Sequence, residues 1–312
     1  MACVLESAAL LSHTGVASTM KVSEFMQSDV RYVTVPGTRE DVLQLMAETQ
    51  ISGFPVCKKG TKTLVGMITR HDLLRKPDEN QLALLMVRDP VTVTPETDAR
   101  KVVDLMLDRG FRRVPVVKSG DLVGIVSVPD ILGAVLEEDK HFQSASIADH
   151  VNRSVTAIWE ETPLPLTFMI MEMAHKTAVV IVNEIGGVTG MMSVSDYIRL
   201  SEETHEDNVS KTYSGTESSV EWGWTSKDFL LVTKKLLKLP NVPVSQVMTK
   251  NLISVSEVAT VSDCVKTLRK SEIDQAPVLS AAGALVGMIE DQDLLKLVAK
   301  RLAPSPRAEK RE

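Results

Sequence analysis

A seven-residue phrase that ends in aspartate recurs four times in this sequence, and its polar residues are the ones best suited to binding chemistry. Each copy has a glycine, two apolar residues, a small polar residue, two variable residues and the aspartate. The copies span residues 66–72, 124–130, 190–196 and 287–293, and only the fourth replaces the small polar residue, with Glu290. A hydroxyl can donate a hydrogen bond and a carboxylate can accept several. The pair therefore suits either a polar ligand or the cap of a helix.

Residues that usually carry catalysis show no catalytic spacing in this sequence. The six histidines form no HxxxH or HExxH pattern, no serine lies in a Gly-x-Ser-x-Gly elbow, and no P-loop is present. The three cysteines are far apart and form no CxxC pair, which argues against a disulfide framework and a zinc site. We therefore expect no enzyme activity, no metal and no cofactor.

The phrases belong to longer repeats, because the sequence upstream of each phrase also agrees. An apolar residue precedes each glycine by 38 to 40 positions, at Met26, Met86, Val151 and Met248. A proline precedes three of the glycines by 9 to 11 positions, at Pro55, Pro115 and Pro277. The third copy lacks this proline. Agreement at several matched offsets indicates a true internal repeat.

The second copy predicts the order of elements in one repeat. Residues 91–94 form a β-branched run, which is typical of a strand. Thr94 and Pro95 are then predicted to begin a helix, since proline is tolerated at the first helical position. Apolar residues between positions 102 and 107 recur at helical spacing, and Gly110 is placed to end the helix.

The rest of the copy predicts a hairpin and a second helix. Residues 114–117 and 122–126 read as two short buried strands that are joined by a polar turn at 118–121. Asp130 is then expected to cap or open a second helix. The repeat is thus a βαββα unit of about 60 residues, which is too small to bury both faces of its sheet alone. Adjacent copies are therefore expected to pair.

These repeats predict an α/β (α+β) fold with four repeats paired into two modules. The third repeat is degenerate, because it lacks the proline and is rich in methionine. Residues 201–219 are rich in Ser, Glu and Thr and predict a mobile loop, whereas residues 227–239 predict an amphipathic helix. The expected boundaries are an N-terminal extension at 1–19, repeats at 20–76, 80–139, 145–200 and 242–302, an insertion or linker at 201–240, and a disordered tail at 303–312.

Composition and charge exclude several classes of protein. Of the 312 residues, 44% are hydrophobic and 24% are charged, which is ordinary for a soluble globular chain. The net charge is −6, so we expect no nucleic-acid partner, because such binding needs a basic surface. No uncharged apolar run approaches the roughly 18 residues of a membrane span, and no signal peptide is evident. We expect a cytoplasmic protein without a membrane partner.

The repeated phrases, the Pro-Val pairs at 55–56, 115–116 and 277–278 and the Met-initiated openings resemble the cystathionine-β-synthase (CBS) domain family. The resemblance covers nearly the whole chain apart from the termini and the insertion. It implies that two repeats form a module with a pseudo-two-fold axis and two clefts. Four such repeats resemble the γ subunit of AMP-activated protein kinase and stand-alone microbial four-domain proteins, in which two modules pack into a flat disc.

The resemblance also implies ligands, namely AMP, ADP, ATP or S-adenosylmethionine, with Asp binding the ribose and the hydroxyl binding a phosphate. One cleft would combine Val91, Phe111, Arg112 and Arg113 with Met67, Thr69 and Asp72. The other would combine Val30, Ile51, Ser52 and Gly53 with Ile125, Ser127 and Asp130. Arg112 and Arg113 stand where the kinase subunit has its phosphate-contacting basic pair, although two solvated surface arginines would look the same in sequence.

The second module departs from this pattern. Glu290 replaces the small hydroxyl, and Asp274 stands where the second repeat has Arg112, so we expect this module to discriminate against phosphate. Ser193, Asp196 and Asp293 are weaker candidates for binding, because each aspartate could simply cap a helix.

Two functions remain open from the sequence. In the first, the protein senses an adenosine-containing ligand and modulates a partner protein. In the second, it is an interaction scaffold with degenerate clefts. A homodimer is compatible with both, and neither the physiological ligand nor the partner can be named.

Overall fold

The fold is described by a computed structural model. It describes residues 20–49, 51–76, 78–200 and 239–302. The predicted N-terminal extension at 1–19, the loop at 201–219, the tail at 303–312 and all but the last residue of the predicted helix at 227–239 lie outside the described residues.

Repeats 1, 3 and 4 each contain one strand that pairs in parallel with the first strand of a hairpin, with a helix between them, and in repeat 2 a single parallel bridge takes the place of that strand. In repeats 1 and 2 the elements are α1 (Val22–Phe25), β1 (Val33–Val35), α2 (Arg39–Thr49), β2 (Gly53–Lys58), β3 (Leu64–Thr69), α3 (Arg70–Arg75), α4 (Leu82–Leu85), β4 (Val87–Arg88), α5 (Ala99–Arg109), β5 (Arg113–Lys118), β6 (Asp121–Ser127) and α6 (Val128–Glu138). A short helix, α7 (Lys140–Ser144), leads to the second module.

Repeats 3 and 4 have the same order of elements. They contain the 3₁₀ turn η1 (Ala148–His150), β7 (Ala157–Trp159), α8 (Leu164–Met173), β8 (Ala178–Val182), β9 (Val188–Ser193), η2 (Val244–Gln246), β10 (Val255–Ser256), α11 (Val261–Lys270), β11 (Gln275–Leu279), β12 (Leu285–Glu290) and α12 (Asp291–Arg301). Residues 194–200 after β9 are also helical. The third repeat therefore folds like the others although it lacks their proline.

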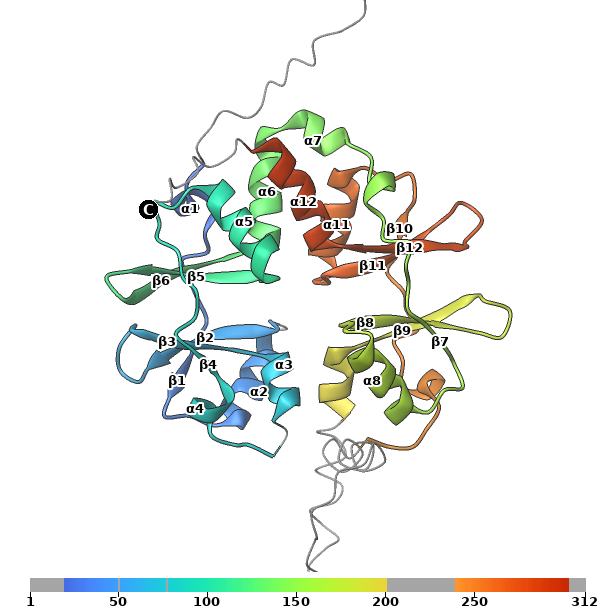
Figure 1. Cartoon of the computed structure of the whole chain (residues 1–312), viewed down its shortest axis with the longest axis horizontal. Helices are drawn as coiled ribbons and strands as arrows, with labels where there is room; N and C mark the ends of the chain where they lie inside the picture. Colours follow the sequence, from blue (N-terminus) through green and yellow to red (C-terminus); the bar gives the residue numbers. More distant parts are fainter. Residues whose placement is uncertain (1–19, 50, 77, 201–238, 303–312) are drawn as a thin grey trace, which may run out of the picture.

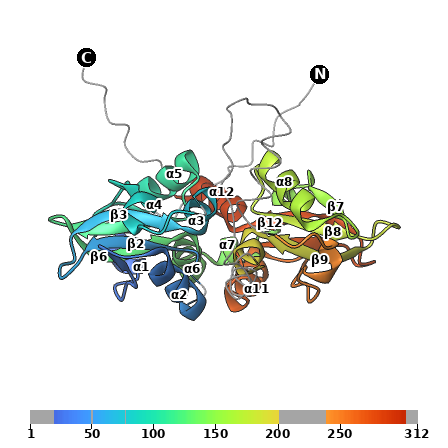
Figure 2. The same ribbon diagram turned by 90° about the horizontal axis from the view of Figure 1, so that it is seen from below.

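The four repeats occupy the four corners of a flat molecule (Figures 1 and 2). Repeats 1 and 2 form one side and repeats 3 and 4 form the other. Helices of repeat 2 face helices of repeat 4, with α6 and α5 both packed on α12. The arrangement matches the disc that the family resemblance implied.

Partners within a module exchange their opening segments. The residues that open repeat 2, β4, pair with β3 of repeat 1, and Gln27 of repeat 1 pairs with Ile125 of repeat 2. Asn152 pairs with Met288 and Met191 with Thr249 in the second module. The sheet of each repeat is thus extended by the opening segment of the other repeat in its module. One repeat alone would lack this pairing and would not form a stable sheet.

The exchange also explains why the phrase begins with glycine. A Cβ atom at Gly66 would lie 2.7 Å from the sulfur of Met86 and 2.8 Å from the carbonyl oxygen of Val87. At Gly124, Met26 of the partner repeat stands equally close, at 2.8 Å. The glycine of each phrase therefore contacts the opening residue of the partner repeat, which is a methionine at three phrases and Val151 at the fourth.

Some predicted boundaries in the second repeat were wrong. The helix begins at Ala99, not at Pro95, because the Asp98 side chain accepts a hydrogen bond from the Arg100 amide. Pro95 lies in a turn that the Thr97 amide closes onto the Thr94 carbonyl. The strand expected at 91–94 is reduced to a single bridge between Val93 and Val116.

Other local predictions in that repeat were confirmed. Gly110 ends α5 with φ 67°, a left-handed conformation that glycine adopts at little cost. The turn at 118–121 joins β5 to β6. Asp130 lies in the first turn of α6, where it bonds back to Ser127, which is the capping residue.

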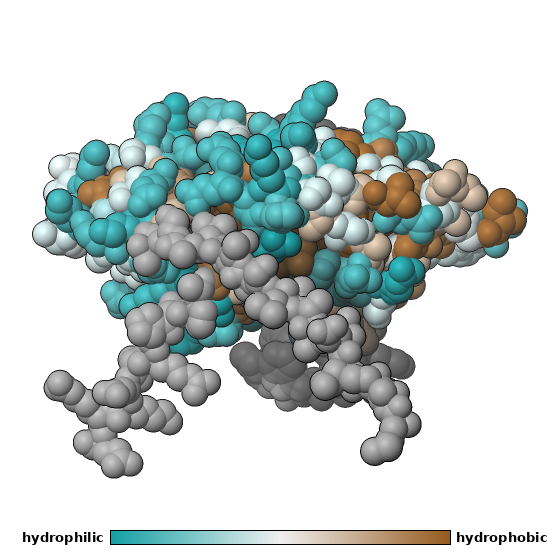
Figure 3. All heavy atoms as spheres, turned by 90° about the horizontal axis from the view of Figure 1, so that it is seen from above, coloured by the Kyte–Doolittle hydropathy of each residue, from teal (hydrophilic) through white to brown (hydrophobic). Residues whose placement is uncertain are grey.

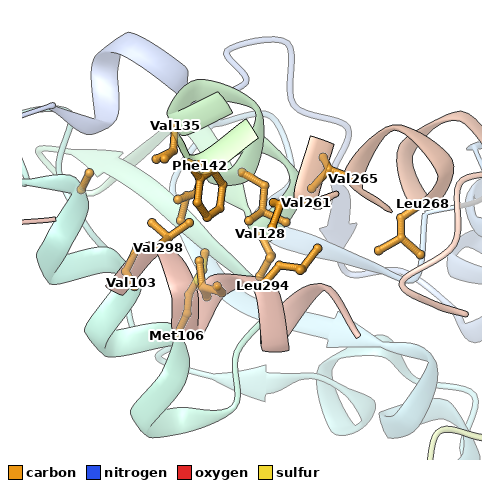
Figure 4. Packing of buried hydrophobic residues seen from close by; sticks show 14 of the residues in the cluster. Val103, Met106, Val128, Val135, Phe142, Val261, Val265, Leu268, Leu294 and Val298 are labelled. Carbon is orange, nitrogen blue, oxygen red and sulfur yellow. The ribbon is translucent and has the colours of Figure 1, made fainter. Parts of the chain in front are cut away.

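The largest core is shared between the two modules (Figure 4). It joins side chains of α5 and α6 in repeat 2 to side chains of α11 and α12 in repeat 4. Phe142 of α7 is fully buried among them. Repeats 1 and 3 have smaller cores of their own, and Leu74 of repeat 1 packs into the core of repeat 3. Of the three methionines in α8, Met169, Met171 and Met173, only Met171 is fully buried, and Met173 is 73% exposed.

The surface above this shared core is mostly hydrophilic, with apolar side chains in separate small groups (Figure 3). None of the helices in the described part of the chain has the length and apolar content needed to cross a membrane.

Candidate functional site

The repeated phrase forms the junction between a hairpin strand and the following helix. The hydroxyl residue caps the helix, and the aspartate three positions later bonds back to it. In repeat 1 the Thr69 amide and hydroxyl donate to one Asp72 oxygen, at 2.9 and 2.6 Å. Ser193 makes the same two bonds to Asp196, at 2.9 and 2.7 Å. One oxygen of each of these carboxylates is therefore occupied by hydrogen bonds within the phrase. Only the other oxygen is available to accept a hydrogen bond from a ligand.

Those second oxygens differ between repeats. In repeat 2 the Gln27 side chain donates to Asp130 at 2.9 Å. In repeats 3 and 4 the second oxygens of Asp196 and Asp293 pair with Arg199 at 3.2 Å and with Lys296 at 2.8 Å. These exposed pairs contribute little energy, so a ligand could replace them.

A central cavity of about 610 Å³ lies where the four repeats meet. Its volume is in the range of small-molecule sites. Its polar lining consists of the hydroxyls of Thr49, Ser52, Ser127, Ser193, Ser195 and Thr249, the guanidinium groups of Arg70, Arg112, Arg113 and Arg269, the carboxylates of Asp196, Glu272, Asp274 and Asp291, and the amides of Asn251 and Gln275. Four positive and four negative side chains thus face one space.

Arg112 is held by carboxylates of the opposite module. It bonds Asp274 and Asp291 of repeat 4, both at 2.5 Å. Asp274 and Arg112 occupy equivalent positions of their repeats, since each stands two residues before the Ala-Pro or Val-Pro pair of its strand. The pair therefore joins the two modules near their pseudo-symmetry axis.

Arg113 and Arg70 have only hydroxyl partners among the bonds that the structure shows. Arg113 donates to Ser52 at 2.7 Å, and Arg70 donates to Ser195 of repeat 3 at 2.7 Å. Burial lowers the pKa of Arg113, and the neighbouring Arg112 lowers it further. Burial also lowers the pKa of Arg70. Two poorly solvated guanidinium groups without a directly bonded carboxylate are well suited to attract an anion.

Asp291 is the most buried charged group of the cavity wall. Its side chain is 3% exposed. One oxygen accepts from Arg112, and the other has no hydrogen-bond partner among the described residues. Burial raises the pKa of Asp291 to about 6, although Arg112 opposes the shift.

A second cavity, of about 20 Å³, lies beside Glu290 in the second module. Lys176, Gln275 and Met288 are among its lining residues. Burial raises the pKa of Glu290, and Asp293 raises it further. The space is that of a water molecule and does not hold a nucleoside in this conformation.

The structure brings seven of the predicted residues together in the central cavity: Ile51, Ser52, Arg112, Arg113, Ser127, Ser193 and Asp196. It does not place the other ten in the lining of that cavity: Val30, Gly53, Met67, Thr69, Asp72, Val91, Phe111, Ile125, Asp130 and Asp293. Arg112 and Arg113 were grouped with Asp72, yet their partners are Asp274, Asp291 and Ser52. Arg112 and Arg113 thus line the cavity at the centre of the disc.

Two further observations concern the second module. Asp274, which was expected to repel phosphate, is paired with Arg112 in the structure. Ser193 and Asp196, which were weaker candidates, border the central cavity. The sequence did not reveal Arg70, Ser195 or Asp291, although each lies between the third and last positions of a phrase. Among the described residues, no group of three or more His, Cys, Asp or Glu side chains is arranged to hold a metal ion.

Comparison with known proteins identifies the family. The sequence profile of the CBS domain matches residues 22–79, 82–137 and 244–300, which make up more than half of the chain. The chain belongs to the CBS domain family. The profile leaves the third repeat unmatched, in keeping with its divergent sequence, although its strands and helix follow the same plan.

Several similar proteins come from archaea. MJ0188, an uncharacterized protein of Methanocaldococcus jannaschii, is 34% identical over 123 residues, which are 38% of this chain and 46% of that protein. The chain thus spans less than half of that relative. An uncharacterized conserved protein from Pyrococcus horikoshii has a TM-score of 0.59 and 26% identity, with 89% of this chain and all of that chain covered.

MJ1225 from Methanocaldococcus jannaschii, which was suggested to be an archaeal homolog of g-AMPK, has a TM-score of 0.70 at 17% identity. The alignment covers 89% of this chain and 100% of that chain. At this identity the likeness shows the shared fold alone.

Proposed function

We propose that the central cavity binds the phosphate end of an adenosine-containing ligand and that the bound state modulates a partner protein. The observation that carries this proposal is the position of Arg70 and Arg113. Both are partly buried, both border the cavity, and both donate to neutral hydroxyls. A phosphate would offer both guanidinium groups a negatively charged acceptor, whereas Ser195 and Ser52 offer only neutral hydroxyls.

The phrases next to the cavity support the same proposal. Ser127 and Ser193 line the cavity, and each begins a junction whose aspartate lies one turn further along the helix. A nucleotide with its ribose at Asp130 or Asp196 would therefore direct its phosphate toward the centre. The ligands to be tested are AMP, ADP, ATP and S-adenosylmethionine.

The alternative is a scaffold whose repeats serve only assembly. Thermal unfolding of the full chain with each adenosine compound separates the two. A ligand at 100 times its Kd should stabilise the folded state by about 2.7 kcal/mol. If no compound of the panel raises the unfolding temperature, the scaffold is the better description.

The phosphate role of Arg113 predicts a difference between two ligands. Arg113→Ala should weaken AMP about tenfold or more, because a hydrogen bond to a charged group contributes about 1.5–3 kcal/mol. Adenosine, which has no phosphate, should bind nearly as before. Isothermal calorimetry on the full chain measures both. Arg109→Ala, at the exposed end of α5, is the matched control and should leave both affinities unchanged. An equal loss for AMP and adenosine would show that Arg113 does not contact phosphate.

A further inference from the structure

We infer that the protonation state of Asp291 controls the binding of a phosphate in the central cavity: the ionised carboxylate repels the phosphate, whereas the neutral carboxylic acid does not. Binding of a phosphate is then accompanied by uptake of a proton from solvent by Asp291. This inference rests on the proposed function and specifies how that site is regulated.

The first observation is the position of Asp291 in the repeat. It directly follows Glu290 at the start of α12, and the equivalent residue of repeat 1 is Arg70. Both side chains reach across the disc to the opposite module, Arg70 to Ser195 and Asp291 to Arg112. Equivalent positions in repeats 1 and 4 thus present opposite charges to the same cavity.

The second observation is that Asp291 is incompletely satisfied where it stands. A buried carboxylate is costly unless all of its oxygens are hydrogen-bonded. Arg112 provides one bond and is itself shared with Asp274, while the other oxygen of Asp291 has no partner among the described residues. Protonation removes the charge and converts an acceptor into a donor.

The charged groups around Asp291 set the direction of the effect. Arg112 and Arg113 favour its ionised form, whereas Asp274 and Glu290 disfavour it. Burial exceeds the effect of the arginines, and the pKa of Asp291 is about 6 in the folded protein. The pKa lies above that of an unfolded aspartate, so the folded chain gains a proton as pH falls through about 6. A phosphate bound nearby would add negative charge and raise the pKa further.

The charge balance of the cavity gives the same result. Four arginines face four carboxylates, so the formal charge of the lining is zero when all are ionised. Protonation of one carboxylate leaves an excess positive charge beside an incoming anion. Where Asp291 is fully ionised in the free protein and fully protonated in the phosphate-bound protein, the two states differ by one proton. Asp291 takes up this proton from solvent, and no other group has to release one.

Calorimetry of the full chain with AMP in two buffers of different ionisation enthalpy tests the inference. At about pH 6.5 the wild-type chain should take up about half a proton more per AMP than Asp291→Asn, if binding raises the pKa by about one unit. The ratio of the two affinities should change up to about tenfold between pH 5 and pH 8, with the wild type favoured at the acid end. Comparison of the two chains cancels the proton that AMP itself takes up.

Asp108→Asn is the matched control, because Asp108 is an exposed aspartate of α5 that does not line the central cavity. It should retain the proton uptake of the wild type. Equal uptake by the wild type and Asp291→Asn would overturn the inference while leaving the proposed function intact. If AMP bound to neither at any pH, the proposed function would fail, and the inference with it.

A measurement on the unmodified chain covers the case that Asp291→Asn does not fold. Carbon NMR of the labelled aspartate carboxyls follows the titration of Asp291 directly. Its pKa should rise by about one unit or more when AMP is added. An unchanged titration in the presence of bound AMP would overturn the inference.

Discussion

Three of the four arginines that line the central cavity differ in how their charges are compensated. Arg112 is held between two carboxylates, so removing it would leave a buried Asp291 unpaired. Arg113 and Arg70 donate to serines and keep most of their charge available. Neighbouring residues of one type therefore differ in role: Arg112 joins the modules, and the other two are the ones that we propose to attract an anion.

Tyr197 offers a test of packing in repeat 3. It is fully buried, its ring packs edge-on against Phe168 at 4.8 Å, and its hydroxyl has no hydrogen-bond partner among the described residues. The other repeats have leucine or isoleucine at this position. Tyr197→Phe should therefore stabilise the chain by about 1 kcal/mol, because a buried hydroxyl without a partner costs about 1–3 kcal/mol.

Urea denaturation measures this change. Tyr197→Leu, which restores the residue type of the other repeats, is a control that also removes the ring contact. A loss of stability on Tyr197→Phe would mean that the hydroxyl does have a partner.

Residue-level prediction succeeded where a pattern recurred and failed where a single residue acted across the disc. Ser193 and Asp196 were found because they repeat the phrase. Arg70 and Asp291 occupy positions that vary between repeats, so nothing in one sequence marks them. Their roles depend on which repeats face each other, and this is a property of the tertiary structure.

At the scale of elements, the exchanged opening segments hold the two repeats of each module together. The strand β4 belongs to repeat 2 in sequence and to the sheet of repeat 1 in space. Backbone hydrogen bonds between the opening segment and the hairpin require close approach, which a glycine without a Cβ permits. The same approach recurs at all four phrases.

Gly66→Ala tests this approach. The added Cβ would meet both the Met86 sulfur and the Val87 carbonyl oxygen, so the opening segment of repeat 2 would have to shift. We expect a loss of about 1–3 kcal/mol in the free energy of unfolding, as for other overpacked sites. Urea denaturation measures it.

The double variant Gly66→Ala with Met86→Ala distinguishes the two contacts. It removes the sulfur but not the carbonyl oxygen, so stability should not be recovered. Wild-type stability in the single variant would show that the segment accommodates a Cβ freely.

Elements were predictable from sequence where local chemistry decides them. Gly110 ends its helix because only a left-handed residue completes the cap. The start of that helix was misplaced because Pro95 and Asp98 are both suitable as first-turn residues, and the turn at 94–97 decides in favour of Asp98. The exchange of segments could not be predicted, since no periodicity shows which sheet a short strand joins.

At the scale of the whole molecule, the two modules are not independent domains. Helices α6 and α12 pack directly on one another, and Arg100 of repeat 2 donates to the carbonyls of Ala299 and Leu302, at 2.6 and 3.0 Å. Arg301 pairs with Asp139 at 3.0 Å across the same boundary. An isolated first module would expose half of the shared core, so binding experiments belong on the full chain.

Because the core is shared, we expect a core substitution in repeat 4 to destabilise repeat 2 as well. Leu294 of α12 is fully buried in it, and Leu294→Ala should cost about 2–5 kcal/mol. Because α6 and α12 lose packing together, amide hydrogen exchange should accelerate in both helices and much less in α2. Leu73→Ala is the matched control, since Leu73 holds the equivalent position in repeat 1, within a separate core. It should accelerate exchange in α2 and spare α12. Unchanged protection of α6 in Leu294→Ala would show that the modules unfold independently despite their common core.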